Sequence, residues 1–304
     1  MLSSASSTVG NLLHAAGQRL TESGSESPRL DAELLLGHVL GVGRATLLAE
    51  PESTVSPAQS AAFTALIERR AKGEPVSYIR GLKEFYGLVL SVDERALIPR
   101  PETETLVELA LERVATALTG APRQAGANPL LVWDVGTGSG AICVALAVEC
   151  RRRGYGRDLR FLATDVSADA LGLATENAVA HGVADTISFA KAELTDLPTT
   201  DFVPADLLLA NLPYIPSAVV PQLPVAASFE PRGALDGGAD GLALIQRLVG
   251  DLPRALALGG TALLEIGSDQ SHAVVNFTPG GWTVVVHDDL SGRPRVAEFM
   301  RGGA

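Results

Sequence analysis

The stretch VWDVGTGSGAICVALA, residues 132–147, constrains the fold more than any other part of this chain. It runs from an apolar strand-like segment through Gly136, Gly138 and Gly140 into a segment with helical spacing. Glycines allow a tight turn and the close approach of a ligand, and the N-terminus of the helix that follows offers free N–H groups. The pattern predicts a nucleotide-like cofactor at the first strand of an α/β sheet. Because Gly136-x-Gly138-x-x-Ala141 also fits the dinucleotide fingerprint, the loop alone does not choose the cofactor.

Strand and helix patterns alternate on both sides of this loop. Short apolar runs predict strands, and longer runs with apolar residues three and four apart predict helices. The alternation predicts a mostly parallel sheet covered by helices on both faces. The predicted strands are 130–135, 159–164, 186–190, 206–210, 261–266, 282–286 and 295–300, and the predicted helices between them are 141–150, 168–180 and 242–258.

The first third of the chain has a different pattern. Residues 1–75 show helical spacing without strand signals, with a proline directly after Ser27 and again after Ser56, as at the first turn of a helix. From residue 76 to residue 100, strand-favouring residues and turn glycines predict a hairpin. We therefore expect a small helical domain over 1–75, a connecting hairpin over 76–100 and an α/β domain over 101–304.

Composition limits the classes of function that remain. With 304 residues and 46% hydrophobic content, the chain can bury a sizeable core. It has no run of about 18 apolar residues for a membrane span and no N-terminal signal peptide, so we expect a cytoplasmic protein without membrane association. The net charge of −11 repels phosphate backbones and argues against direct nucleic-acid binding. The histidines lack the spacing of metal ligands, so we expect no metal site, and we take the chain to be a monomer.

The segment LLLANLPYIP, residues 207–216, ends a buried strand in an unusual way. If the sheet reverses direction next to the first strand, Asn211 faces the cofactor, because ligands bind beyond the carboxyl ends of strands at such a point. Leu212 precedes a proline and is pushed toward extended geometry, which aims its carbonyl outward, while Pro213 has no N–H to compete. The Asn211 side-chain oxygen and the Leu212 carbonyl would form two neighbouring acceptors, and Tyr214 could cover a flat group by stacking.

Two adjacent acceptors and an aromatic lid suit a planar NH2 group. An amide nitrogen is a poor nucleophile, so holding both of its hydrogens in front of an electrophilic methyl group would supply orientation and restore some nucleophilicity. We therefore assign the catalytic and substrate-binding roles to Asn211, Leu212, Pro213 and Tyr214.

Further candidates for the cofactor site follow the second and third strands. Asp165 ends the second strand, where an acidic residue can accept hydrogen bonds from both ribose hydroxyls of a dinucleotide or of S-adenosylmethionine (SAM). Glu193, after the third strand, could accept from an adenine amino group, with Leu194 against the ring.

Several motifs together resemble the N5-glutamine methyltransferases of the HemK/PrmC type, which methylate the glutamine of the Gly-Gly-Gln motif in peptide chain release factors. The resemblance spans nearly the whole chain and is carried by RLDAELLLGHVLG, RRAKGEPVSYIRGLKEFYG, LIPRPETETLV, DVGTGSGAI, DVSADAL, NLPYIP, EPRGALDGGADGL, LLEIG and DLSGRPRV. The stretch IPRPETE and the helical N-terminal domain distinguish this family from other SAM enzymes.

This resemblance implies a fold and a set of site residues. The fold would be that of a class I SAM-dependent methyltransferase, a Rossmann-like mostly parallel sheet, and the protein partner would be a release factor. The cofactor SAM would be held by Gly136, Thr137, Gly138, Ser139, Gly140, Asp165, Glu193, Leu194 and Asn211. The glutamine pocket would be formed by residues 211–214 and walled by Phe85. The resemblance also places Arg100, Glu102 and Thr103 near the cofactor, and Glu230-Pro231 at the pocket rim or at a loop anchor.

One position departs from the family motif, which is Asn-Pro-Pro-Tyr, because residue 212 is leucine here. Other NH2 acceptors stay open on the residues alone: a ribosomal-protein glutamine, a small-molecule guanidine or amine, or N6 of adenine. A nicotinamide oxidoreductase would share the loop and Asp165 but gives no role to residues 211–214. A SAM-binding scaffold without catalysis has no need of Asn211 and Tyr214.

Overall fold

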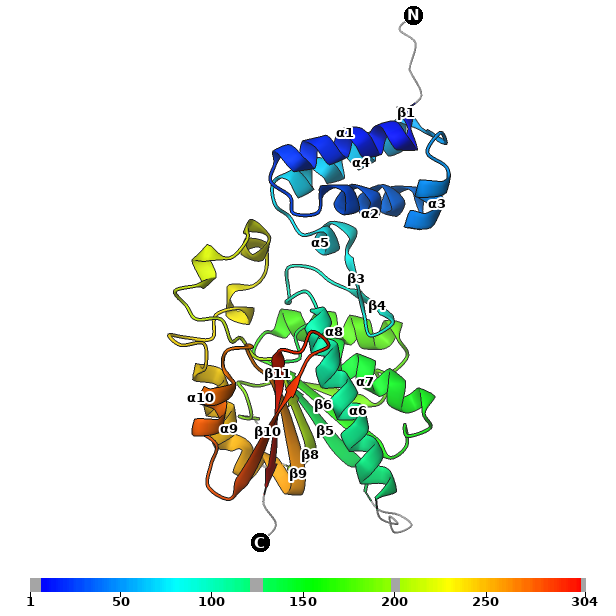
Figure 1. Ribbon diagram of the computed structural model, residues 1–304. Coiled ribbons are helices and arrows are strands. Elements are labelled where there is room, and N and C mark those ends of the chain that lie inside the picture. Colours follow the sequence, from blue (N-terminus) through cyan, green and yellow to red (C-terminus); the bar gives the residue numbers. More distant parts are fainter. Residues whose placement is uncertain (1–6, 121–127, 198–202, 302–304) are drawn as a thin grey trace, which may run out of the picture. The chain divides into compact units, whose positions relative to one another are not determined.

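The computed structural model describes residues 7–120, 128–197 and 203–301 (Figure 1). By its internal contacts the chain divides into two compact units. The first unit comprises the chain up to Leu82 together with Leu223–Phe229, and the second comprises Lys83–Gln222 and the chain from Glu230 onward.

The first unit is built of helices around its own apolar core. The helices are α1 (Val9–Glu22), α2 (Pro28–Leu40), α3 (Arg44–Ala49), α4 (Pro57–Ala71) and α5 (Val76–Arg80). Ser56 caps α4, because its side chain accepts from the N–H of Gln59 and the Gln59 side chain accepts from the N–H of Ser56. Leu20, Leu35 and Phe63 are buried between the helices.

Two details of the first unit differ from the sequence prediction. Strands β1 (Ser7–Thr8) and β2 (Thr54–Val55) pair antiparallel, and two-residue strands are too short to show alternation in a sequence. The predicted hairpin over 76–100 is wrong at its start, where α5 lies. Gly81, in the left-handed conformation at φ 70°, ends this helix, and Ile79 is buried in the helical core, so packing overrides the strand preference of the segment.

The second unit begins with a hairpin that packs on its core. Strands β3 (Leu82–Phe85) and β4 (Leu88–Ser91) pair, and both turn residues, Tyr86 and Gly87, have positive φ, as a tight type I′ turn requires. A short 3₁₀ helix, η1 (Pro101–Thr103), then leads into α6 (Glu104–Thr119).

A seven-stranded sheet with the order β10-β11-β9-β8-β5-β6-β7 forms the centre of the second unit. Strands β9, β8, β5, β6 and β7 are parallel, and β10 and β11 are antiparallel additions at one edge. The strands are β5 (Leu130–Val135), β6 (Leu159–Asp165), β7 (Ile187–Lys191), β8 (Ala205–Ala210), β9 (Leu256–Glu265), β10 (Trp282–Asp288) and β11 (Pro294–Arg301). The predicted mostly parallel sheet is confirmed.

Helices cover both faces of this sheet (Figure 1). They are α6, α7 (Ala141–Arg152), α8 (Ala168–Ala180), α9 (Ala243–Ala255) and α10 (Ser271–Asn276). The 3₁₀ turns η2 (Val220–Gln222), η3 (Val225–Phe229) and η4 (Arg232–Ala234) precede α9 in the chain. Successive residues of β8 point to opposite faces, so Leu207 and Leu209 join the core beneath α6 and α7, while Leu208 joins the core beneath α9. Both faces are apolar, and for this reason the strand reads as continuously hydrophobic.

The predicted helix over 242–258 is wrong at its end. Helix α9 stops at Ala255, two residues after Pro253, and Leu256 is already extended and pairs with Ala205 in β8. Pro253 weakens the last turn of the helix, and from Leu256 onward the chain forms strand β9, which pairs with β8. Among the described residues, the structure contains no helix with both the length and the apolar character needed to cross a bilayer.

Candidate active site

A cavity of about 380 Å³ lies in the second unit beyond the carboxyl ends of the parallel strands. Strand β5 is flanked by β6 on one side and β8 on the other, so the chain reverses its direction of progress across the sheet at β5. Ligands of open α/β sheets bind at such a reversal, and the volume is within the range of small-molecule sites. The position and the size of the cavity both fit a cofactor.

Most of the predicted site residues line this one cavity. They are Gly136, Thr137, Gly138, Ser139, Asp165, Glu193, Leu194, Asn211, Leu212 and Pro213, and they are joined by Arg100, Thr103 and Pro231. Gly140, Tyr214, Phe85, Glu102 and Glu230 are not among the described residues that line it.

The glycine loop between β5 and α7 forms one wall. Gly136 and Gly138 have φ values of 73° and 55°, in a backbone conformation that residues other than glycine rarely adopt. The N–H groups of Gly136 and Thr137 donate to the carbonyl of Thr164 at 2.8 and 2.9 Å, which ties the loop to the end of β6. Gly140 serves packing instead, because a Cβ there would lie 3.0 Å from that of Ala174 on α8.

Asp165 connects the loop to the end of β6. Its Oδ2 accepts from the N–H of Gly138 at 2.9 Å, and its Oδ1 accepts from the N–H of Ser167 at 2.9 Å. A carboxylate has about four acceptor positions, so both oxygens can take a further hydrogen bond from a ligand hydroxyl. Asp165 thus holds the loop and faces the cavity at the same time.

Glu193 and Leu194 follow β7 and line the cavity. Leu194 is buried and has a φ of 52°, an uncommon conformation for a branched side chain. Backbone strain of this kind concentrates at functional sites. The Glu193 carboxylate is more than half exposed and forms an ion pair with Arg247 at 2.7 Å.

Asn211 follows β8 directly and reaches across to the start of α6. Its amide nitrogen Nδ2 donates a hydrogen bond to the Thr103 hydroxyl at 3.1 Å. Since the nitrogen occupies this contact, the oxygen Oδ1 of the same amide points away from Thr103. Asn211 therefore presents an acceptor, and not a donor, on its other side.

Tyr214 lies beside the cavity wall and not in it. Its ring packs against the core beneath α9, and its hydroxyl donates to Oε1 of Glu265 at 3.3 Å. Burial raises the pKa of Tyr214 to about 12, so the hydroxyl stays protonated and remains a donor at neutral pH. The carbonyl of Tyr214 accepts from Gln270 at 3.0 Å, which fixes the turn that contains residues 211–214.

Two further candidate residues, Phe85 and Glu230, also lie outside the described lining of the cavity. Phe85, the predicted wall of the glutamine pocket, is 1% exposed within the core of the second unit, because its side of the hairpin packs against that core. Glu230 accepts from the N–H of Ile98 at 3.0 Å and pairs with Arg100 at 2.5 Å. It anchors the segment that brings Pro99 and Arg100 to the cavity.

The relatives of this chain share one description. Residues 11–81 match the PrmC N-terminal domain family. The release factor glutamine methyltransferase of Moorella thermoacetica is 40% identical over 267 residues, which cover 88% of each chain. That of Agrobacterium fabrum is 37% identical over 297 residues, covering 97% of this chain and 98% of the relative.

This chain belongs to the release factor glutamine methyltransferase family. The resemblance seen in the sequence motifs is thereby confirmed. Among solved structures, the hMettl16 catalytic domain in complex with a MAT2A 3′UTR hairpin matches with a TM-score of 0.50 and 17% identity, covering 71% of this chain and 76% of that one. At that identity the likeness supports the methyltransferase fold and nothing further.

Two buried carboxylates in this member of the family escape prediction from sequence. Asp134, fully buried in β5, accepts a hydrogen bond from the Thr137 hydroxyl at 2.7 Å, and burial raises the pKa of Asp134 to about 7. Glu265, which is 1% exposed at the end of β9, accepts a hydrogen bond from the Tyr214 hydroxyl. An acidic residue inside an otherwise apolar strand is the signal that could have found both.

Proposed function

We propose that this chain transfers a methyl group from SAM to the side-chain amide nitrogen of the glutamine in the Gly-Gly-Gln motif of release factors. The observation that carries the proposal is the orientation of Asn211, whose nitrogen is occupied by Thr103 while its oxygen is left for a ligand. Membership of the release factor glutamine methyltransferase family supports the same acceptor. It does not favour adenine N6 or a small-molecule amine.

The residues around the cavity fit SAM. The loop glycines keep side chains out of the wall at Gly136 and Gly138, so a ligand can approach the backbone N–H groups there. Asp165 offers acceptors to a pair of ribose hydroxyls, and Leu194 offers an apolar surface to a flat ring. When bound, SAM supplies an electrophilic methyl group on a sulfonium centre.

The chain's own residues would orient the acceptor nitrogen. Asn211 Oδ1 and the Leu212 carbonyl would each accept one hydrogen of the glutamine NH2 group, which turns the nitrogen lone pair toward the methyl group. Orientation of this kind can contribute several powers of ten in rate. No strong base is needed nearby, because an N-methylated amide cation is acidic and loses its proton readily. Leu212, which is buried in the cavity wall, would exclude water from one side of the pocket.

The direct test is to locate the transferred methyl group. The purified chain is incubated with methyl-labelled SAM and recombinant release factors, and the labelled peptide is mapped by mass spectrometry. We expect label on the glutamine of Gly-Gly-Gln and none on a release factor in which this glutamine is replaced by glutamate. Label on DNA, on free arginine or on a ribosomal protein, with none on release factors, would contradict the proposal.

The proposal includes a setting for the reaction. We place it in the cytoplasm, on a monomeric enzyme that makes no direct contact with nucleic acid, since a net charge of −11 repels phosphate backbones.

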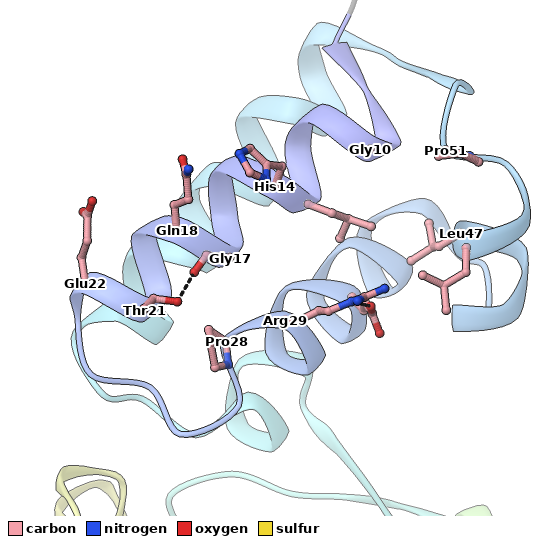
Figure 2. Close-up of a pocket in the computed structure, with 13 residues that line it drawn as sticks. Gly10, His14, Gly17, Gln18, Thr21, Glu22, Pro28, Arg29, Leu47 and Pro51 are labelled. Atoms are coloured by element: carbon pink, nitrogen blue, oxygen red, sulfur yellow. Dashed lines mark hydrogen bonds and ion pairs between the residues drawn. The ribbon is translucent and has the colours of Figure 1, made fainter.

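We further propose that the helical unit recognises the release factor. This unit contains a second cavity, of about 900 Å³, between α1, α2 and α3 (Figure 2). His14 and Gln18 of α1 line it, and so does Leu48 of α3, which is 47% exposed. An exposed apolar residue beside polar side chains can serve as a contact in a protein–protein interface.

A substitution in this groove is expected to weaken recognition without changing the chemistry. Leu48→Glu should raise KM for an intact release factor about tenfold, because it removes an apolar contact with that protein. It should leave kcat within about twofold, because the residues that line the cofactor cavity are unchanged. Steady-state kinetics would measure both constants. A short Gly-Gly-Gln peptide has no second docking site, so its KM should be the same for both enzymes.

The matched control is Ala65→Glu, on the exposed side of α4 and outside the groove. It adds the same charge to the same unit. An equal rise of KM in both variants would show a general charge effect and would remove the groove from the recognition surface.

A further inference from the structure

Glu265 is a buried carboxylate that the proposed mechanism does not use. It ends β9, the strand next to β8, and its side chain is 1% exposed. The Tyr214 hydroxyl donates to Oε1 of Glu265 at 3.3 Å, and Oε2 has no hydrogen-bond partner among the described residues. A buried carboxyl group so incompletely paired is costly to stability, which suggests a role in function.

Thr103 connects this carboxylate to the asparagine at the cavity. The Thr103 side chain is 3% exposed, so water does not satisfy it. Its hydroxyl accepts from Nδ2 of Asn211 at 3.1 Å. Burial raises the pKa of Glu265, and the Thr103 hydroxyl opposes that rise, as a donor to the ionised carboxylate would. A hydroxyl has one proton, and donating that proton to Glu265 leaves only acceptor positions for Asn211.

We propose that Glu265 and Thr103 are positioning residues that determine which end of the Asn211 amide faces the cavity. When it is ionised, the Glu265 carboxylate can only accept hydrogen bonds, and it then fixes the direction of the Thr103 hydroxyl. That hydroxyl holds the Asn211 nitrogen, and the Asn211 oxygen is presented to the substrate. This inference rests on the proposed function, in which the Asn211 oxygen binds the NH2 group of glutamine.

The opposite arrangement would disable the site. If the Thr103 hydroxyl were free to turn, it could donate to Oδ1 of a rotated Asn211, and the Asn211 NH2 group would then face the NH2 group of the substrate. Two donors cannot form a hydrogen bond with one another. An amide side chain has nearly the same shape in both orientations, so packing alone does not choose between them.

The test compares two substitutions of Thr103. Thr103→Val keeps the branched shape and removes the hydroxyl, and we expect kcat to fall about ten- to hundredfold. Thr103→Ser keeps the hydroxyl and should retain a kcat within about threefold of wild type, although it loses a methyl group from a buried site. A purely structural role would give the reverse order, because serine leaves the larger packing defect.

A double-mutant cycle shows whether Thr103 acts through Asn211. In the background of Asn211→Ala, the further change Thr103→Val should lower kcat by less than about twofold, because the group that Thr103 positions is already absent. Equal losses in the two backgrounds would overturn the inference.

A readout independent of activity is the side-chain NH2 signal of Asn211 in a nitrogen-15 NMR spectrum. Asparagine occurs at only a few positions, Asn11, Asn128, Asn177, Asn211 and Asn276, so the Asn211 signal can be assigned by its loss in Asn211→Ala. We expect this signal to move in Thr103→Val and to stay in place in Thr103→Ser. An unmoved signal in Thr103→Val would contradict the inference.

Glu265→Gln is the second variant, for the case in which Thr103→Val does not fold. Its NH2 group can donate to Thr103 and reverse the direction of the hydroxyl, so we expect a fall in kcat of similar size. Wild-type kcat in this variant would overturn the inference. Failure of the proposed function is distinguishable, because the wild-type chain would then be inactive on release factors while the NMR comparison could still be made.

Discussion

The Asn211→Ala variant is expected to turn over at about one hundredth of the wild-type rate or less, because loss of one oriented polar contact in an active site costs roughly 10²–10³ in kcat. Asn211 is the residue at the cavity whose orientation is set by a hydrogen bond to a buried partner, Thr103. Removing its oxygen leaves one hydrogen of the acceptor NH2 group unbound, and the nitrogen is no longer held in line. Single-turnover rates on a release factor, at saturating SAM, measure this step directly.

The matched control for this variant is Asn276→Ala, which changes an exposed asparagine on α10. It should keep the wild-type rate. Near-normal turnover by Asn211→Ala on a release factor would remove this residue from the mechanism.

For Asp165→Ala, the expected result is weaker SAM binding, with the dissociation constant raised about a hundredfold or more. Hydrogen bonds to a charged group contribute roughly 1.5–3 kcal/mol each, and the variant loses the acceptors of both ribose hydroxyls. It also loses the bond from the Gly138 N–H, which helps to hold the glycine loop. Isothermal titration calorimetry with SAM measures the change.

Asp169→Ala is the control for this effect, since it removes the same charge from an exposed position in the first turn of α8. Its affinity for SAM should match that of the wild type. The assignment of Asp165 to the ribose fails if calorimetry finds the same dissociation constant for Asp165→Ala and the wild type.

Leucine at position 212, where the family motif has proline, is accommodated by packing. The Leu212 side chain is 5% exposed and belongs to the core beneath α9. Its Cδ2 lies 3.0 Å from the place that a Cβ on Gly136 would take. The leucine therefore fills the space above a loop glycine, and the side chain that replaces proline becomes part of the cavity wall.

The amino-acid sequence alone was enough to predict much of the second unit. The bounds of β5 and α8 were predicted as the structure has them, and the glycine loop was predicted between a buried strand and a helix. These features depend on residues near one another in the chain: a short apolar run, a helical period and glycines at a turn. Sequence motifs also sufficed for the family.

Contacts between distant residues decided the rest. The residues next to Phe85 in the sequence predict a strand whether its side chain faces the core or a pocket. The packing of the hairpin on the core determined that Phe85 faces the core. Helix α5 and the end of α9 depend on burial and on strand pairing that local preference does not contain. Asp134 and Glu265 carry no local sign of the hydroxyls that reach them.

The sequence by itself therefore determined most of the order of strands and helices in the second unit, the loop for the cofactor and the identity of the residue that follows β8. Only the tertiary structure decided how that residue is oriented. Asn211 and its partner Thr103 are 108 positions apart, and Glu265 comes from a third segment. The direction of a hydrogen bond depends on every donor and acceptor around it, and those groups come together only when the sheet and α6 have packed.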